Sequence, residues 1–97
     1  PRKKYIPTTV FPYHISNRCN NKEWFRLPLP LVWNIFCAQL QDSSERYSVL
    51  LHSFVLMSNH FHLMVSTPMG NLDSFLRHFL TETARAIQRA SGRINHI

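Results

Sequence analysis

Residues 60–66 of this 97-residue chain alternate strictly between two kinds of position, and this alternation constrains the fold more than any other feature. One set of positions is apolar: Phe61, Leu63 and Val65. The other set begins with two histidines: His60, His62 and Met64. Because successive side chains of an extended strand point to opposite faces, we predict a strand with one face in a core and the other face open.

Two further segments have the sequences of strands. Residues 10–17 alternate loosely and place Phe11, Tyr13 and Ile15 on one face. Pro12 favours a position at a sheet edge or at a bulge. Residues 47–56 are rich in β-branched, aromatic and leucine residues, which predicts a well-buried strand. A tight turn at residues 58–59 separates this strand from residues 60–66.

Two segments repeat apolar residues at the three- and four-residue spacing of an amphipathic helix. The first is predicted from residue 29 to about residue 41, with Pro30 in its first turn, where the missing N–H costs nothing. Residues 42–46 are expected to break this helix. The second is predicted from residue 72 to residue 88, with Asn71 as its cap and Gly92 as a stop signal.

The resulting order of elements is strand, helix, strand, strand, helix, in one domain that covers residues 1–97. This order is typical of an α+β, ferredoxin-like fold, in which an antiparallel sheet carries both helices on one face. The fourth strand of such a fold is expected to be incomplete or missing, and residues 1–9 are expected to form a flexible basic arm. The sheet edge left open invites pairing with a second copy, so a homodimer through that edge is expected.

The composition excludes several classes of protein. With 44% hydrophobic and 16% charged residues, the chain is not expected to be disordered. Its longest apolar stretch is too short to cross a bilayer, which excludes a membrane partner. Cys19 and Cys37 lack metal-site spacing and are interpreted as reduced thiols, Cys37 in a helix core, which predicts a cytoplasmic protein. The net charge of +6 points to a polyanionic partner, most often nucleic acid.

His60 and His62 are the most informative residues for function. On a strand they share one face, so the two imidazoles can bind one divalent cation and leave other coordination positions open. By itself, such a pair is more often two hydrogen-bonded or solvent-facing histidines. His14 alternates onto the open face of the first strand, either as a plain surface histidine or as an accessory residue that orients a phosphate or a metal-bound water. His52 is interpreted as a structural histidine.

The surroundings of the histidine pair resemble a known family. Residues 57–65, M-S-N-H-F-H-L-M-V, are similar to the M-P-N-H-x-H-L motif of the single-tyrosine HUH transposases, particularly the group associated with repetitive extragenic palindromes. Residues 13–21, Y-H-I-S-N-R-C-N-N, resemble the first strand and loop of that family, Y-H-V-x-N-R-G-N-N. The resemblance covers roughly residues 10–95 and corresponds to the amino-terminal part of the family domain. Ser58 replaces the usual proline, which loosens the turn but leaves both histidines.

The resemblance implies a DNA transposase that cleaves and rejoins single-stranded, hairpin-forming DNA by transesterification. It implies that His60 and His62 bind magnesium or manganese, which polarises the scissile phosphate. It also implies a tyrosine on a later helix, whose hydroxyl attacks a phosphate to form a 5′-phosphotyrosine and release a 3′ hydroxyl. The tyrosines of this chain all precede the pair: Tyr5, Tyr13 and Tyr47. The nucleophile is therefore expected beyond residue 97, and the isolated chain is expected to be inactive in strand transfer.

The polar loop at residues 18–28 mixes basic and aromatic side chains, which suits binding of a single strand. Lys and Arg contact phosphates, and aromatic rings stack on unpaired bases. The candidate DNA-binding residues, with the basic terminus included, are Arg18, Lys22, Trp24, Arg26, Lys3 and Lys4. Two other interpretations remain open. The chain could be a non-catalytic nucleic-acid-binding module, or His60, His62 and a cysteine could form a structural zinc site, although no second ligand pair has zinc spacing.

Overall fold

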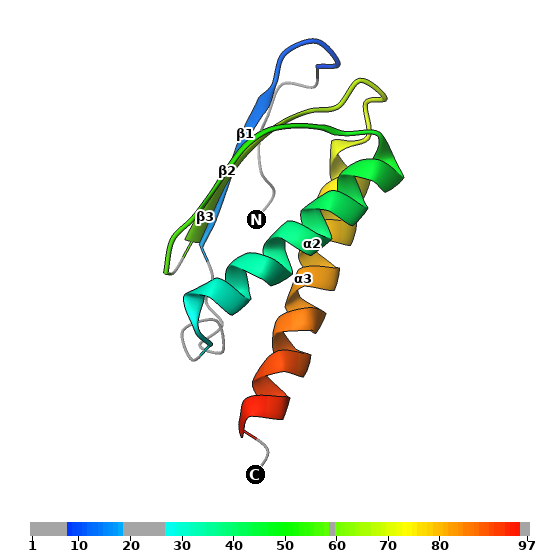
Figure 1. Cartoon of the computed structure of the whole chain (residues 1–97). Coiled ribbons are helices and arrows are strands. Elements are labelled where there is room, and N and C mark those ends of the chain that lie inside the picture. The colour runs from blue at the N-terminus through cyan, green and yellow to red at the C-terminus, as the bar shows by residue number, and fades with distance from the viewer. Residues whose placement is uncertain (1–7, 19–26, 59, 96–97) are drawn as a thin grey trace.

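A computed structural model of the chain describes residues 8–18, 27–58 and 60–95 and contains five elements (Figure 1). In chain order they are β1 (Tyr13–Arg18), α2 (Leu29–Tyr47), β2 (Leu50–Leu56), β3 (His60–Ser66) and α3 (Leu72–Asn95). The α+β class and the order β-α-β-β-α predicted from the sequence are confirmed. No helix within the described residues has the length and apolarity needed to cross a membrane.

β3 is the central strand of a three-stranded antiparallel sheet with the order β1-β3-β2. His62 of β3 is paired with Ser16 of β1 on one side and with Val55 of β2 on the other. The pairing of β2 with β3 shifts register between Leu51 and Ser53. Among the described strands, β1 and β2 therefore lie at the two edges of the sheet.

Both helices lie on one face of the sheet, and none of the described residues forms a helix on the opposite face (Figure 1). The apolar positions of β3 are buried, with exposed fractions of 2% for Phe61 and 0% for Leu63. Phe36 of α2 and Phe79 of α3 meet Phe61, with ring centroids 5.3 and 5.9 Å from it. Each such aromatic residue contributes about 1.5–3 kcal/mol of hydrophobic free energy when it is fully buried. This packing fixes β3 from the helix side and leaves its alternate positions on the open face.

The first helix is longer than predicted, because residues 42–46 continue α2 to Tyr47. These polar residues find partners inside the helical structure. Ser43 is fully buried, Ser44 donates its hydroxyl to the carbonyl of Leu40 at 2.5 Å, and Asp42 pairs with Arg46 at 3.7 Å. The helix ends at Tyr47, and the cap residue that follows it, Ser48, has a left-handed backbone with φ 55°.

The second strand is shorter and more exposed than predicted. It begins at Leu50, since Tyr47 belongs to α2. Its apolar side chains are not well buried: Leu50, Leu51 and Val55 have exposed fractions of 55%, 46% and 49%. The expectation was wrong because an apolar run is also compatible with an edge strand whose outer face has no covering layer.

The ends of two other elements also differ from the sequence expectation. β1 begins at Tyr13 instead of residue 10, because the hydroxyl of Thr8 accepts the N–H groups of Val10 and Phe11 and bends the chain before the strand. α3 passes through Gly92 and continues to Asn95. A glycine inside a helix costs only about 1 kcal/mol, which is too little to end a helix that packs along its length.

Candidate metal centre on the open sheet face

His60 and His62 lie on β3, two residues apart, at positions that alternate with the buried Phe61 and Leu63. Both histidines are half-buried. Their ring centroids are 5.1 Å apart, and the ring planes meet at 82°. The structure thus brings the two imidazoles together on one face of β3. On the other face of the strand, Phe61 packs in the aromatic core.

His14 of β1 reaches the same pair from the neighbouring strand. Its position in the sheet is opposite Met64, so it lies diagonally across from His62. Diagonal neighbours are within reach of each other when the side chains are long or aromatic. Nε2 of His14 lies 3.2 Å from Nδ1 of His62, and the two rings are nearly parallel, with centroids 5.2 Å apart. Three histidines therefore form one cluster on the open face, which we call the histidine cluster: His14, His60 and His62.

The chemistry of the histidine cluster suits a cation only in part. Within residues 8–18, 27–58 and 60–95, no three His, Cys, Asp or Glu side chains are arranged to hold a metal ion. His14 directs its Nε2 at His62, so it does not act as a third ligand in this arrangement. His60 and His62 offer two imidazole nitrogens, which are acceptable but not preferred ligands for magnesium or manganese. A complete coordination shell would need oxygen ligands from elsewhere, such as phosphate or water.

His52, another histidine of the sheet, has a partner of its own. Its Nε2 lies 2.7 Å from the hydroxyl of Ser66. This contact agrees with the interpretation of His52 as a structural histidine. It also makes His52 a useful comparison residue for the histidine cluster.

The two described tyrosines lie away from the histidine cluster. The hydroxyl of Tyr13 accepts the N–H of Thr8 at 2.7 Å and donates to the Thr8 carbonyl at 3.2 Å. Tyr47 ends α2 on the helical side of the sheet, with its ring 5.7 Å from that of His78. Both contacts are packing and structural contacts. Tyr5 lies outside the described residues.

Most of the predicted DNA-binding residues also lie outside the described residues: Lys3, Lys4, Lys22, Trp24 and Arg26. Arg18 is the exception, since its backbone ends β1 opposite His60, although its side chain is not described. The predicted arm at residues 1–9 and Cys19 fall largely or wholly in the same undescribed parts of the chain. Cys37 lies on α2, half-buried, and so is on the helical side of the sheet.

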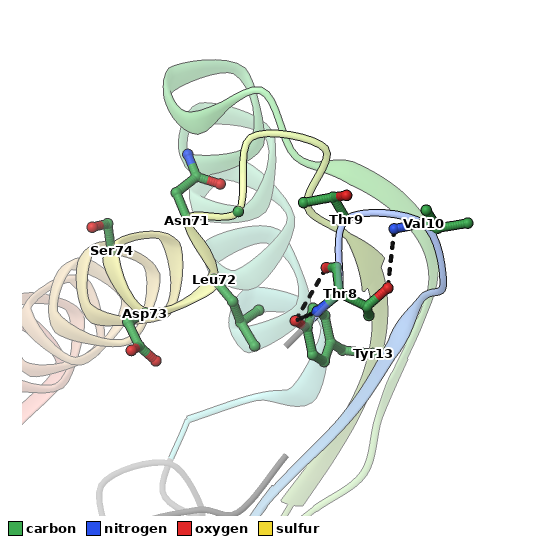
Figure 2. Close-up of a pocket in the computed structure, with 9 residues that line it drawn as sticks. Thr8, Thr9, Val10, Tyr13, Asn71, Leu72, Asp73 and Ser74 are labelled. Carbon is green, nitrogen blue, oxygen red and sulfur yellow. Dashed lines mark hydrogen bonds between the residues drawn. The ribbon is translucent and has the colours of Figure 1, made fainter. Parts of the chain in front are cut away.

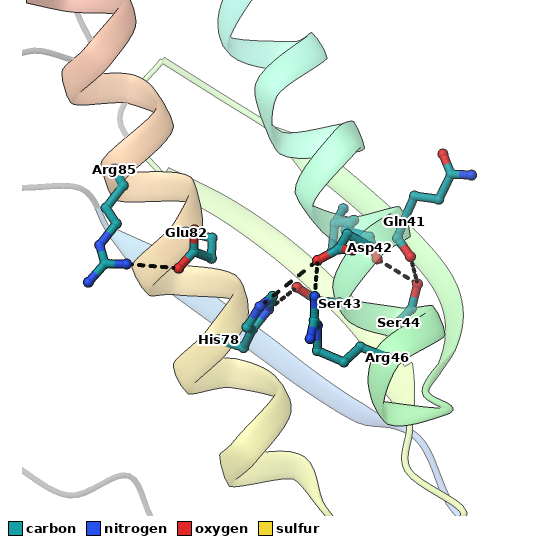
Figure 3. Close-up of polar contacts among 9 residues, drawn as sticks. Gln41, Asp42, Ser43, Ser44, Arg46, His78, Glu82 and Arg85 are labelled. Atoms are coloured by element: carbon teal, nitrogen blue, oxygen red, sulfur yellow. Dashed lines mark hydrogen bonds and ion pairs between the residues drawn. The ribbon is translucent and has the colours of Figure 1, made fainter.

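A polar cluster between the helices was not anticipated from the sequence (Figure 3). Nδ1 of His78 lies 3.0 Å from the hydroxyl of Ser43, and its Nε2 lies 3.9 Å from Asp42, which also pairs with Arg46. The contact of His78 with Ser43 joins residues 35 positions apart, so spacing along the chain gives no signal for it. Because Ser43 is fully buried, its hydroxyl stabilises the packing of α2 against α3 and does not meet a substrate.

A hollow of about 620 Å³ lies between the segment before β1 and the start of α3 (Figure 2). Thr8 and Tyr13 form one wall, and Asn71 and Asp73 form part of the other. The carboxylate of Asp73 occupies the first turn of α3, where a negative charge stabilises the helix. The same charge opposes binding of an anion at that helix end.

Comparison of the chain with protein-family models, with curated proteins and with solved structures gave no match. The functional interpretation therefore depends on the motif residues and on the geometry around them.

Proposed function

We propose that this chain is a member of the single-tyrosine HUH transposase family and carries the metal-binding strand of that enzyme. The observation that carries the proposal is the placement of His60 and His62 on one open face of the central strand of an antiparallel sheet. The flanking residues 57–65 and 13–21 resemble the two motifs of the family. In the structure the two motifs are adjacent, because β1 pairs directly with β3.

The proposed substrate is single-stranded, hairpin-forming DNA. The net charge of +6 favours a nucleic acid, since Lys and Arg neutralise phosphates. His60 and His62 would hold magnesium or manganese, whose chemistry is polarisation of the scissile phosphate. Both helices cover the other face of the sheet, so among the described residues the open face leaves access for a phosphate beside the pair (Figure 1). A cytoplasmic location and a homodimer formed through a sheet edge belong to the same proposal.

A non-catalytic nucleic-acid-binding module is the alternative function, and one observation favours it. Tyr13 is hydrogen-bonded to Thr8, and Tyr47 lies on the helical side, so neither hydroxyl faces the histidine cluster. Strand cleavage requires a tyrosine whose hydroxyl faces the histidine cluster. Without a further tyrosine, the chain would bind DNA and form no covalent adduct. Because Cys37 lies across the sheet from the pair, it offers no support for a structural zinc site.

Manganese binding tests the metal-binding role of His60 and His62. We expect the 97-residue chain to bind Mn²⁺ with modest affinity and expect His60→Ala and His62→Ala each to weaken binding at least tenfold, because each removes one of two nitrogen ligands. Electron paramagnetic resonance of free Mn²⁺ measures the affinity. His52→Ala is the matched control and should bind as the wild type does. Equal affinity in all four proteins would refute the metal site.

A nicking assay separates the enzyme from the binding module. Hairpin-flanked single-stranded DNA is incubated with the chain, with and without Mg²⁺, and denaturing electrophoresis detects cleavage or a covalent adduct. We expect binding by this chain and no adduct, since the described tyrosines are engaged elsewhere. An adduct that is lost in Tyr5→Phe would instead assign the nucleophile to Tyr5. Absence of DNA binding would refute both functions.

A further inference from the structure

The contact between His14 and His62 joins a residue of β1 to a proposed metal ligand on β3. Nε2 of His14 and Nδ1 of His62 are 3.2 Å apart, within the range of a hydrogen bond. His14 is exposed and His62 is half-buried. Register alone does not force the contact, because the residue directly opposite His62 is Ser16. The contact depends on the orientation of both imidazole rings.

The proton in this hydrogen bond has two alternative positions, with opposite consequences for His62. A neutral imidazole has one N–H group and one nitrogen lone pair. If His14 donates, the lone pair on Nδ1 of His62 is occupied and the proton of His62 is on Nε2, so neither nitrogen is available to a cation. If His62 donates its Nδ1–H, its Nε2 keeps a free lone pair. Only the second arrangement is compatible with ligation by a neutral His62.

We propose that His14 is a positioning residue that accepts the Nδ1–H of His62 and keeps Nε2 of His62 free for the cation. The inference rests on the proposed function, which assigns His62 as a ligand. Metal-binding histidines almost always donate their second N–H to a fixed acceptor, commonly a carboxylate or a backbone carbonyl. In this chain the imidazole of His14 takes that place. His14 thereby fixes the tautomer and the ring orientation of His62 without adding a negative charge beside the site.

The tautomer of His62 can be measured without any metal. Long-range ¹H–¹⁵N correlation spectra of the metal-free chain report which ring nitrogen carries the proton. We expect the proton of His62 on Nδ1 in the wild type and a shift towards Nε2 in His14→Ala. A proton on Nε2 of His62 in the wild type would overturn the proposal, because His14 would then be the donor.

Manganese affinity tests the positioning role itself. We expect His14→Ala to weaken Mn²⁺ binding about tenfold, the lower end of the range for such partners, because the pair is partly exposed to water. Gln places an amide oxygen near the position of the imidazole Nε2, so His14→Gln should accept the same proton and restore most of the affinity. His52→Ala should leave the affinity unchanged. An unchanged affinity in His14→Ala would overturn the positioning role.

The two measurements separate failure of this inference from failure of the proposed function. If the wild type binds no Mn²⁺, the metal site of the proposed function fails, while the spectra still decide whether His14 accepts the proton. If the wild type binds Mn²⁺ and the His62 proton is on Nε2, the metal site stands and the role of His14 fails.

Discussion

Cys37 shows how a single side chain on α2 responds to its surroundings. The thiol is half-buried, and burial raises its pKa above the ordinary value of 9.0, because the thiolate is disfavoured away from water. Since the thiolate is the reactive form, Cys37 is expected to be a poor nucleophile at neutral pH.

The reactivity of Cys37 can be measured in a Cys19→Ser variant, which leaves one thiol. We expect alkylation by iodoacetamide at pH 8 to be slower than for free cysteine and to accelerate only above the ordinary thiol pKa. Because the folded chain favours the neutral thiol, Cys37 contributes to the free energy of unfolding at pH values below the ordinary thiol pKa. This contribution is lost as the pH rises through the higher pKa of the folded state. Alkylation as fast as that of free cysteine would contradict this prediction.

At the scale of elements, the two glycines of the chain have opposite roles. Gly92 lies inside α3, and an added Cβ there would meet nothing within 4 Å. Gly70 lies before α3 with φ +66°, a left-handed backbone that disfavours side chains. The glycine that resembles a helix stop is thus dispensable, whereas the glycine in the turn is required by its backbone.

Alanine at each glycine tests this difference. We expect Gly92→Ala to increase the free energy of unfolding by about 0.5–1 kcal/mol, because alanine has the higher helix propensity. Gly70→Ala should lower it by about 1–2 kcal/mol, because the left-handed conformation is costly for a residue with a Cβ. Urea unfolding followed by circular dichroism measures both values. The interpretation fails if the two variants change stability in the same direction.

The bounds of an element were predicted well where apolar residues recur at strict spacing. They were missed where contacts with another element decide them. The sequence predicted β3 with its observed bounds because apolar residues occupy every second position over seven residues. The end of α2 was missed because its polar residues find partners on α3, which a local pattern does not reveal. In the candidate site, the shared face of His60 and His62 follows from their spacing. The contact of His14 with His62 depends on ring orientation across two strands, so the sequence indicated only a shared face.

At the scale of the whole molecule, charge is distributed unevenly. Residues 47–72, which include β2 and β3, contain no Asp, Glu, Lys or Arg, although the chain as a whole carries a net charge of +6. Edge strands usually carry a charge, often Lys, that prevents pairing with another chain. β2 lies at a sheet edge with exposed Leu51 and Val55 and has no such charge.

A lysine in β2 tests whether this edge mediates self-association. We expect the wild type to form dimers at high concentration and expect Val55→Lys to shift it to the monomer, because each copy would then bring a charged side chain to the paired edge. Sedimentation equilibrium measures the mass. A lysine at Met69, a 70% exposed position outside the strands, is the matched control and should leave association unchanged. A wild type that stays monomeric at high concentration would exclude association through this edge.

The position of β3 between two edge strands determines what kind of assembly the sheet can build. If β2 pairs with β2 of another copy, the two-fold symmetry closes the complex at two chains and ends growth. If β1 pairs with β2 of the next copy, each addition leaves a fresh edge, and the sheet lengthens into a filament. In a filament the row of histidine clusters would repeat along one surface, whereas a closed pair would present two clusters, one in each half of a continuous six-stranded sheet.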